Sequence, residues 1–203
     1  MTQDDLVKGL SKYLPPDTAV PMAQLIVEHK VHMRVSRERS SKMGDYRPPH
    51  DGKGHRISVN HNLNSYAFFI TLVHEIAHLK AWNQYQNRVD PHGKEWKGHF
   101  QNLMLPYLGK SIFPEDIEKA LSRYLKNPAA SSCSDPHLYK VLARYDDVPV
   151  IHLDDIPPGS KFGLGNGMVF IKGEKQRTRY RCKEVNKGRH YFVSGIAVVE
   201  LLD

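Results

Sequence analysis

The sequence predicts an α+β protein, in which a helical domain with a small antiparallel sheet is followed by a small all-β module. Two observations predict this order. The first part of the chain combines apolar residues at helical spacing with two short stretches of strand-like alternation. After residue 150, short β-branched and aromatic runs are separated by turns rich in Gly, Pro and Asn. We therefore expect a first domain at residues 1–126, a linker with a short helix at 127–149, and a β-sheet or barrel at 150–203.

The composition is that of a soluble globular protein, with 40% hydrophobic and 25% charged residues among 203. The formal net charge of +7 suggests a polyanionic partner. No apolar run is long enough to span a membrane, and an acidic pair stands where a signal peptide has a basic start. We expect a cytoplasmic protein, with nucleoid association as an option and no membrane partner. The isolated Cys133 and Cys182 should be ordinary thiols, with Cys182 on a strand, because two cysteines form neither a disulfide framework nor a four-cysteine zinc site.

The N-terminal stretch predicts two helices and then two strands. Residues 2–14 have apolar side chains at helical spacing and end at Pro15 and Pro16, and Asp17 or Thr18 can cap the next helix. Apolar and polar residues then alternate from Val31 to Val35 and again from His55 to Asn60, so these two strands should pair. The turn-rich segment between them, residues 37–54, is expected to form a loop or an irregular hairpin, with a short strand near Lys42–Arg47.

A long apolar stretch without Gly or Pro predicts a helix from about Asn64 to Gln86, with Asn64 or Ser65 as its N-cap. It contains His74-Glu75-Ile76-Ala77-His78, an H-E-x-x-H motif. Two histidines four residues apart on a helix share one face, so both imidazoles can reach one metal ion. The glutamate between them can act as a general base toward water. The alternative is a chance motif in a chain with 12 histidines, but burying two His and a Glu in an apolar helix is costly without a partner.

A catalytic zinc needs a third protein ligand, and the candidates downstream are His92, Glu95 and His99. Asp90 and Pro91 form a good helix start, and the helix that follows should run through Trp96 and end at Pro106. Another helix should run from Pro114 to about Leu125. Because His92 lies where the chain enters the helix, next to a glycine and near an anchoring tryptophan, it is the favoured ligand.

These two motifs, Val73 to Leu79 followed by Pro91 to Trp96, resemble the SprT-like (Spartan-type) zinc metallopeptidase family over roughly residues 1–125. The resemblance implies a zincin-like helical domain, Zn²⁺ bound by His74, His78 and His92, and Glu75 as the catalytic residue. Glu95 is the runner-up ligand, because glutamate is the third ligand in other zinc peptidases. The chain departs from many bacterial members, since two isolated cysteines cannot form their C-terminal zinc ribbon.

The expected chemistry is zinc-assisted peptide hydrolysis, with Glu75 taking a proton from the attacking water and passing it to the leaving amine. A second donor to the oxyanion is usual, and Tyr66, Tyr85 and His55 are the candidates. An edge strand beside the metal helix could bind an extended substrate by main-chain hydrogen bonds.

A basic strand is expected in the C-terminal module. On a strand from residue 177 to 183, Arg177, Arg179, Arg181 and Lys183 share one face, and residues 172–191 contain eight basic and two acidic residues. Such a face can follow a phosphate backbone. The alternative is a solvated edge strand whose charges prevent edge-to-edge pairing.

The sequence therefore predicts a zinc endopeptidase that acts on proteins bound or crosslinked to DNA, with a protein substrate and DNA as partners. One alternative is a non-proteolytic module that contains structural zinc and binds DNA or protein. Another is a zinc hydrolase that acts on something other than protein. An open fourth coordination position on the metal favours the two enzyme hypotheses. A fourth position filled by Glu95 or His99 favours the non-proteolytic module with structural zinc.

Overall fold

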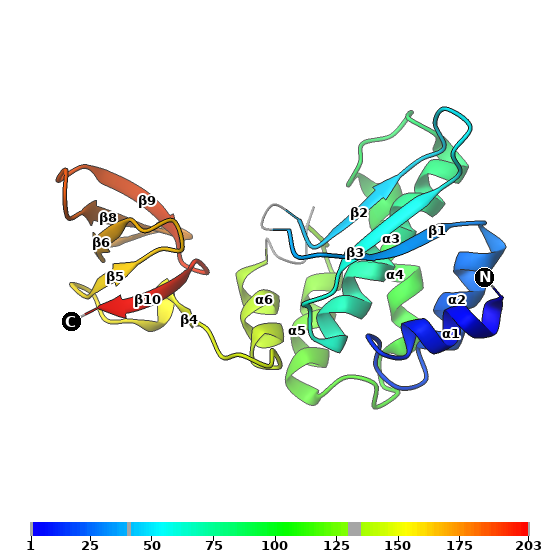
Figure 1. Cartoon of the computed structure of the whole chain (residues 1–203), viewed down its shortest axis with the longest axis horizontal. Coiled ribbons are helices and arrows are strands. Elements are labelled where there is room, and N and C mark those ends of the chain that lie inside the picture. The colour runs from blue at the N-terminus through cyan, green and yellow to red at the C-terminus, as the bar shows by residue number, and fades with distance from the viewer. Residues whose placement is uncertain (1, 40–41, 130–134, 203) are drawn as a thin grey trace. The chain divides into compact units, whose positions relative to one another are not determined.

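The computed structural model describes residues 2–39, 42–129 and 135–202, and the chain divides into two compact units, Met1–Asp146 and Asp147–Asp203. The first unit holds all the α-helices of the described ranges together with a small sheet, and the second is all β (Figure 1). The mixed α+β class and the all-β C-terminal part are thus confirmed. Residues 136–143, which the sequence pattern assigned to a linker with a short helix, form a helix that belongs to the first unit.

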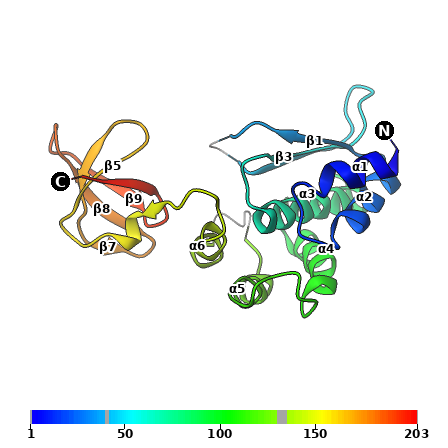
Figure 2. The ribbon, with the colours of Figure 1, turned by 60° about the horizontal axis from the view of Figure 1, so that its bottom comes forward.

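The first unit is built around helix α3, Ser65–Tyr85. The Asn64 side chain caps it by accepting a hydrogen bond from the Ala67 N–H (3.0 Å), as the sequence predicts. Its buried side chains lie on all faces, because a sheet packs on one side and helix α4, Lys94–Met104, on another (Figure 2). The H-E-x-x-H motif therefore lies within the core of this unit.

The sheet of the first unit contains β1 (His32–Ser36), β2 (Gly44–Arg47) and β3 (Arg56–Asn60) in the order β1-β3-β2. The expected pairing of β1 with β3 is confirmed, but these strands run parallel, and only β2 pairs antiparallel to β3. The prediction of an antiparallel sheet was therefore wrong for this unit. Side-chain alternation is the same for either direction of pairing, and here the chain crosses from β1 to the far side of β3, forms β2 and returns. As a result, β2 is the sheet edge beside α3.

Four further helices complete this unit: α1 (Gln3–Leu10), α2 (Ala19–Glu28), α5 (Glu115–Leu125) and α6 (Pro136–Ala143), with a short 3₁₀ turn at Leu105–Tyr107. Helix α1 is shorter than the expected 2–14, and the residues after it form a turn in which the Tyr13 N–H donates to the Leu10 carbonyl (2.9 Å). Among the described residues no helix is both long and apolar enough to cross a membrane.

The second unit is an antiparallel sheet with its own core. Its strands pair in the order β4-β10-β5-β6-β8-β7, and β9 also pairs with β8. They are β4 (Ile151–His152), β5 (Lys161–Gly163), β6 (Val169–Ile171), β7 (Lys175–Gln176), β8 (Arg179–Glu184), β9 (His190–Ser194) and β10 (Val198–Leu202), with a 3₁₀ turn at Leu153–Asp155. Phe162, Phe170 and the free thiol of Cys182 are buried in the core, and Cys182 lies on a strand as expected. Cys133 lies outside the described residues.

Candidate metal centre

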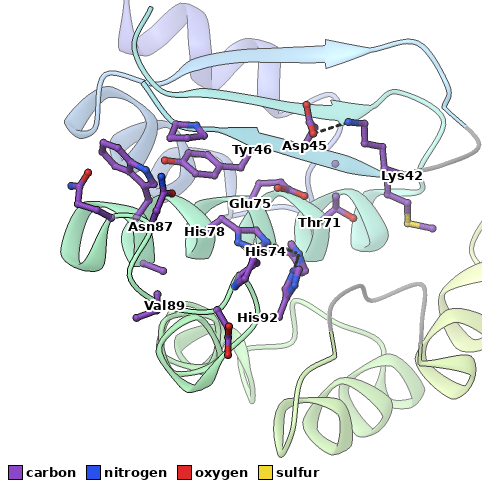
Figure 3. Close-up of a pocket in the computed structure, with 18 residues that line it drawn as sticks. Lys42, Asp45, Tyr46, Thr71, His74, Glu75, His78, Asn87, Val89 and His92 are labelled. Atoms are coloured by element: carbon purple, nitrogen blue, oxygen red, sulfur yellow. Dashed lines mark hydrogen bonds and ion pairs between the residues drawn. The ribbon is translucent and has the colours of Figure 1, made fainter. Parts of the chain in front are cut away.

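Three histidines from two parts of the first unit converge at one point (Figure 3). The Nε2 atom of His74 lies 3.2 Å from that of His78 and 3.4 Å from that of His92. His74 and His78 are one turn apart on α3, and His92 comes from the turn that precedes α4. Within the described ranges, these are the residues that could hold a metal ion together.

The nitrogen separations fit tetrahedral coordination. Bonds of about 2.0–2.1 Å from metal to imidazole nitrogen require nitrogen–nitrogen separations of about 3.3–3.4 Å in a tetrahedral site. The separations from His74 Nε2, 3.2 Å to His78 and 3.4 Å to His92, are close to this range. A hydrogen bond can satisfy one pair of these nitrogens, but three lone pairs that face one point are satisfied together by a cation. The three side chains therefore fit a metal ion.

The turn before α4 brings His92 to the site. Its Gly93 N–H donates to the Asp90 carbonyl (3.0 Å), and Gly93 is the N-cap of the helix. The helix thus begins at Lys94 rather than at Pro91, and His92 lies outside it. A Cβ on Gly93 would come within 3.2 Å of the Asp90 Cβ, so a glycine keeps this turn tight.

Trp96, in the first turn of α4, forms the floor of the site. It is fully buried, and its ring centroid lies 4.6 Å from that of His74, 5.4 Å from His78 and 4.8 Å from His92. Its indole N–H donates to the His74 carbonyl (3.4 Å), and its ring stacks on Phe100. Trp96 therefore joins α4 to α3 at the point where the histidines meet.

Burial keeps the histidines neutral. It lowers the pKa of His74 to about 3, with further contributions from His78 and His92, and lowers the pKa of His78 to about 3. The pKa of the more exposed His92 is also lowered, first by burial and then by the charge of Lys97. Neutral imidazoles offer the lone pairs that a metal ion needs.

Glu75 lies between the histidines and β2 (Figure 3). Its carboxylate is buried and accepts a hydrogen bond from the Tyr46 backbone N–H. Burial raises the pKa of Glu75 to about 8, and the charge of Asp45 acts in the same direction. The carboxylate lies so close to the strand that a Cβ on Gly44 would come within 2.4 Å of Glu75 Oε1. A glycine at this position of β2 makes room for the glutamate.

A cleft of about 550 Å³ contains these groups, and it is lined by β2, α3 and the segment from Gln86 to His92. The open edge of β2 borders this cleft. The Asn60 N–H donates to the Met43 carbonyl (2.8 Å). In an antiparallel pair, every second residue directs its N–H and C=O toward the partner strand, so the main-chain groups of Gly44 and Tyr46 point away from β3. The Tyr46 N–H already binds Glu75, so the Gly44 N–H and the carbonyls of both residues remain on the open edge.

The other candidate ligands and oxyanion donors lie elsewhere. Glu95 is beside Lys94 and His99 is beside Tyr85, and neither belongs to the group of described residues that could hold a metal. Tyr66 packs against Phe113 and Tyr145, and neither it nor Tyr85 is among the described residues that line the cleft.

Sequence reasoning missed Tyr46. Its hydroxyl hydrogen-bonds His55 Nδ1 (3.0 Å), its ring stacks beside His78, and burial raises its pKa. The expected short strand near Lys42–Arg47 was the available signal, but nothing in the alternation indicated that this strand borders the motif helix.

The basic strand differs from its prediction in two respects. Arg177 has φ 57° and lies in the turn between β7 and β8, so the strand face carries Arg179, Arg181 and Lys183, all exposed. In addition, β8 is not an edge, because it pairs with β9 on one side and with β6 and β7 on the other. The edge-protection alternative is therefore wrong for this strand.

Comparison with known proteins agrees with the histidine motifs. Residues 21–112 match the sequence model of the SprT-like family. A stretch of 42 residues is 50% identical to Protein SprT of Escherichia coli (strain K12) and to Protein SprT of Shigella boydii serotype 4 (strain Sb227). That stretch covers 20% of this chain and only 25% of each relative's length. No solved structure matches. The resemblance that the two histidine motifs indicate is confirmed, because residues 21–112 match the SprT-like family model.

Proposed function

We propose that this protein is a zinc-dependent endopeptidase with a zincin-like catalytic domain, and that it acts on proteins bound or crosslinked to DNA. One observation carries the proposal. Three histidines whose ligand nitrogens lie within 4.8 Å of one another and a buried carboxylate, Glu75, lie in the same cleft, and no described side chain completes the metal site as a fourth ligand. An incomplete set of protein ligands is the arrangement of catalytic rather than structural zinc.

In this mechanism His74, His78 and His92 would hold Zn²⁺, which when bound would supply Lewis-acid activation of water and of the scissile carbonyl. In its ionised form, which a cation held by the histidines would favour, Glu75 acts as the general base, takes a proton from the attacking water on a carboxylate oxygen, and delivers it to the leaving amine. The Tyr46 N–H and the close approach to Gly44 orient that carboxylate toward the cleft. Trp96 fixes α4, which follows the turn that carries His92, relative to the helix that carries His74 and His78.

The open edge of β2 supports a peptide substrate. An extended peptide can pair with the main-chain groups of Gly44 and Tyr46 as an added strand, which would bring a scissile bond alongside Glu75. Recognition of this kind uses the backbone and accepts many sequences. It suits an endopeptidase that removes varied proteins.

The basic side chains of β8 support the association with DNA. Because β8 is an interior strand, protection of an edge does not account for Arg179, Arg181 and Lys183, whereas a phosphate backbone does. A protease that is held on DNA meets proteins bound there at high effective concentration. The proposal places such a protein in the cytoplasm, at the nucleoid.

Metal content and cleavage should be measured together on the full chain. We expect one zinc per chain, cleavage of a DNA-binding protein that increases when DNA is added, loss of cleavage with a chelator, and recovery with zinc. Zinc without any cleavage would favour the non-proteolytic DNA- or protein-binding module. Cleavage at the same rate with and without DNA would support the peptidase activity and contradict the association with DNA.

Gly44→Ala should reduce turnover while the chain stays folded. The new methyl group would lie 2.4 Å from Glu75 Oε1 and 2.7 Å from Thr71 Cγ2, so the carboxylate or the strand must move. Displacing a catalytic group by about 1 Å can cost about 10²-fold in rate. Steady-state cleavage of a fluorogenic peptide provides the measurement. Gly54→Ala is the matched control, because the atom nearest to its added Cβ is 3.7 Å away, and equal losses in both variants would contradict the role of Gly44.

A further inference from the structure

Thr71 is a buried polar residue that the proposed mechanism does not use. It lies on α3 one turn before Glu75, and it is only 4% exposed. Among the described residues, its hydroxyl oxygen, Oγ1, has no hydrogen-bond partner. A buried hydroxyl without a partner destabilises a fold, whereas valine has nearly the same shape and no polar atom to satisfy. The threonine therefore indicates a partner that reaches this position from outside the chain.

Thr71 faces the cleft and the first residue of β2 (Figure 3). A Cβ built on Gly44 would come within 2.7 Å of Thr71 Cγ2 and even closer to Glu75 Oε1. The side-chain direction of Gly44 therefore points at α3, toward Thr71 and Glu75. Because glycine has no side chain, β2 can lie close to the helix at this level. A substrate side chain with the same direction as that of Gly44 would meet Thr71.

The open edge of β2 determines which substrate residue has this direction. Gly44 has both its N–H and its carbonyl on that edge, so it can form two hydrogen bonds with one residue of an added antiparallel strand. Antiparallel pairing is slightly more stable per residue than parallel pairing, and directly opposite residues point to the same face. The substrate residue opposite Gly44 would therefore direct its side chain toward α3 and Thr71.

The same register fixes the position of that residue relative to the scissile bond. In an antiparallel strand, the preceding residue lies opposite Asp45 and directs its carbonyl away from β2. The histidines lie on that side, and Glu75 lies between them and β2 (Figure 3). The carbonyl opposite Asp45 is therefore the one that faces the three histidines and can be attacked beside Glu75. The residue opposite Gly44 then follows the scissile bond directly on its C-terminal side.

The space beside Thr71 suits a short, uncharged side chain. Because β2 lies close to α3 at Gly44, a strand added in the plane of β2 leaves little depth for a side chain that points at the helix. The carboxylate of the neighbouring Glu75 disfavours an acidic group there. The Thr71 hydroxyl can both donate and accept a hydrogen bond, so it complements a hydroxyl or a carboxamide group.

We infer that Thr71 determines specificity by selecting serine, threonine or asparagine directly after the scissile bond. The inference rests on the proposed peptidase function and names the substrate feature that its cleft recognises. The Thr71 hydroxyl forms a hydrogen bond with the selected side chain, while Gly44 pairs with the main chain of the same substrate residue. That residue is thus held by its side chain and its backbone together.

Cleavage by the zinc-loaded full chain should first be mapped by mass spectrometry on a mixture of peptides, with DNA present. Serine, threonine and asparagine should be enriched at the first position after the cleaved bonds. Two pairs of quenched fluorescent peptides, which differ at that position alone by serine against alanine and by threonine against valine, then give kcat/KM. We expect the parent to prefer the hydroxyl-bearing peptide of each pair by about 2- to 12-fold, which is the range for one hydrogen bond.

Thr71→Val should abolish this preference, and Thr71→Ser should keep it. The melting temperature of Thr71→Val should be no lower than that of the parent, because the change removes an unsatisfied polar atom. Thr18→Val is the matched control. Thr18 is also buried, but its hydroxyl donates to the Pro15 carbonyl (2.7 Å), and it is not among the described residues that line the cleft. This variant should lose stability and retain the preference.

Peptide binding gives a second readout that does not depend on turnover. The zinc-loaded Glu75→Gln protein should bind the labelled serine peptide more tightly than the alanine peptide by about the same 2- to 12-fold in fluorescence anisotropy. Adding Thr71→Val to that protein should make the two affinities equal. Unequal affinities in the double variant would mean that another group recognises the hydroxyl, and would overturn the assignment to Thr71.

The outcomes distinguish this inference from the proposed function. If no peptide is cleaved, the peptidase function fails and the inference fails with it. If peptides are cleaved but the parent shows no preference, or Thr71→Val keeps it, only the inference fails. A preference at the residue before the scissile bond would mean that the peptide runs parallel to β2, and would overturn the register. An equal loss of turnover on all four peptides in Thr71→Val would assign the hydroxyl to the support of Glu75 instead of the substrate.

Discussion

Replacing Glu75 with glutamine is expected to remove most peptide cleavage and to leave the bound metal in place. The amide has no basic oxygen to take a proton from water, and general acid–base catalysis typically contributes about 10²- to 10⁴-fold to a rate. The residues that could hold the metal are His74, His78 and His92, and this change touches none of them. We therefore expect turnover to fall by that factor at unchanged zinc content.

Glutamine should also preserve the local structure. Its amide oxygen can accept the hydrogen bond that the Tyr46 N–H donates to Glu75, and it occupies the same space beside Gly44. Steady-state cleavage, zinc stoichiometry and thermal unfolding should be measured on the same preparations. A melting temperature equal to that of the parent would assign the loss of turnover to chemistry.

Glu95→Gln is the matched control for Glu75→Gln. Glu95 lies on α4 but outside the group of histidines that could hold a metal, so the turnover of this variant should equal that of the parent. Cleavage by Glu75→Gln at the parent rate would mean that Glu75 is not the general base. Loss of zinc by that variant would instead mean that Glu75 helps to hold the metal.

Local patterns were sufficient to predict the motif helix. The stretch after Asn64 has apolar residues on every face and a capping side chain at its start, and both features are properties of a few consecutive residues. The spacing of His74 and His78 on that helix follows from helix geometry alone. The convergence of His92 with them depended on a longer-range inference, which drew on the turn at Gly93 and on the anchor at Trp96.

Strand pairing was harder to predict, because register and direction are set by contacts far apart in the sequence. The alternation of apolar and polar residues indicated short strands at β1 and β3, but this alternation is the same whether the neighbouring strand is parallel or antiparallel. It also could not indicate that β2 is the edge beside Glu75, and for that reason Tyr46 was missed. In the second unit, one positive φ at Arg177 removed that residue from the predicted strand face.

Replacing His92 with alanine is expected to abolish tight zinc binding and cleavage together. His92 supplies the nitrogen that lies 3.4 Å from His74 Nε2, and without it the two helix histidines hold the metal alone. Changes to residues that merely support a ligand cost about 10- to 100-fold in metal affinity, so the loss of the ligand itself should cost more than about 100-fold. Competition with a fluorescent zinc chelator measures this affinity.

Thermal unfolding gives an independent readout of the same site. Zinc that binds only the folded chain should raise the melting temperature of the parent and should have little effect on His92→Ala. Tryptophan fluorescence can follow the transition, because both tryptophans of the chain, Trp82 and Trp96, lie in the first unit.

His99→Ala and Glu95→Gln are the controls that test the choice of third ligand. Both residues lie on α4, within two turns of His92, and both are outside the group of described residues that could hold a metal. Each variant should bind zinc as the parent does. If Glu95→Gln lost zinc and His92→Ala retained it, the third ligand would be a carboxylate and the three-histidine site would be wrong. Zinc retained by all three variants would mean that the metal is held elsewhere, because two helix histidines alone do not account for tight binding.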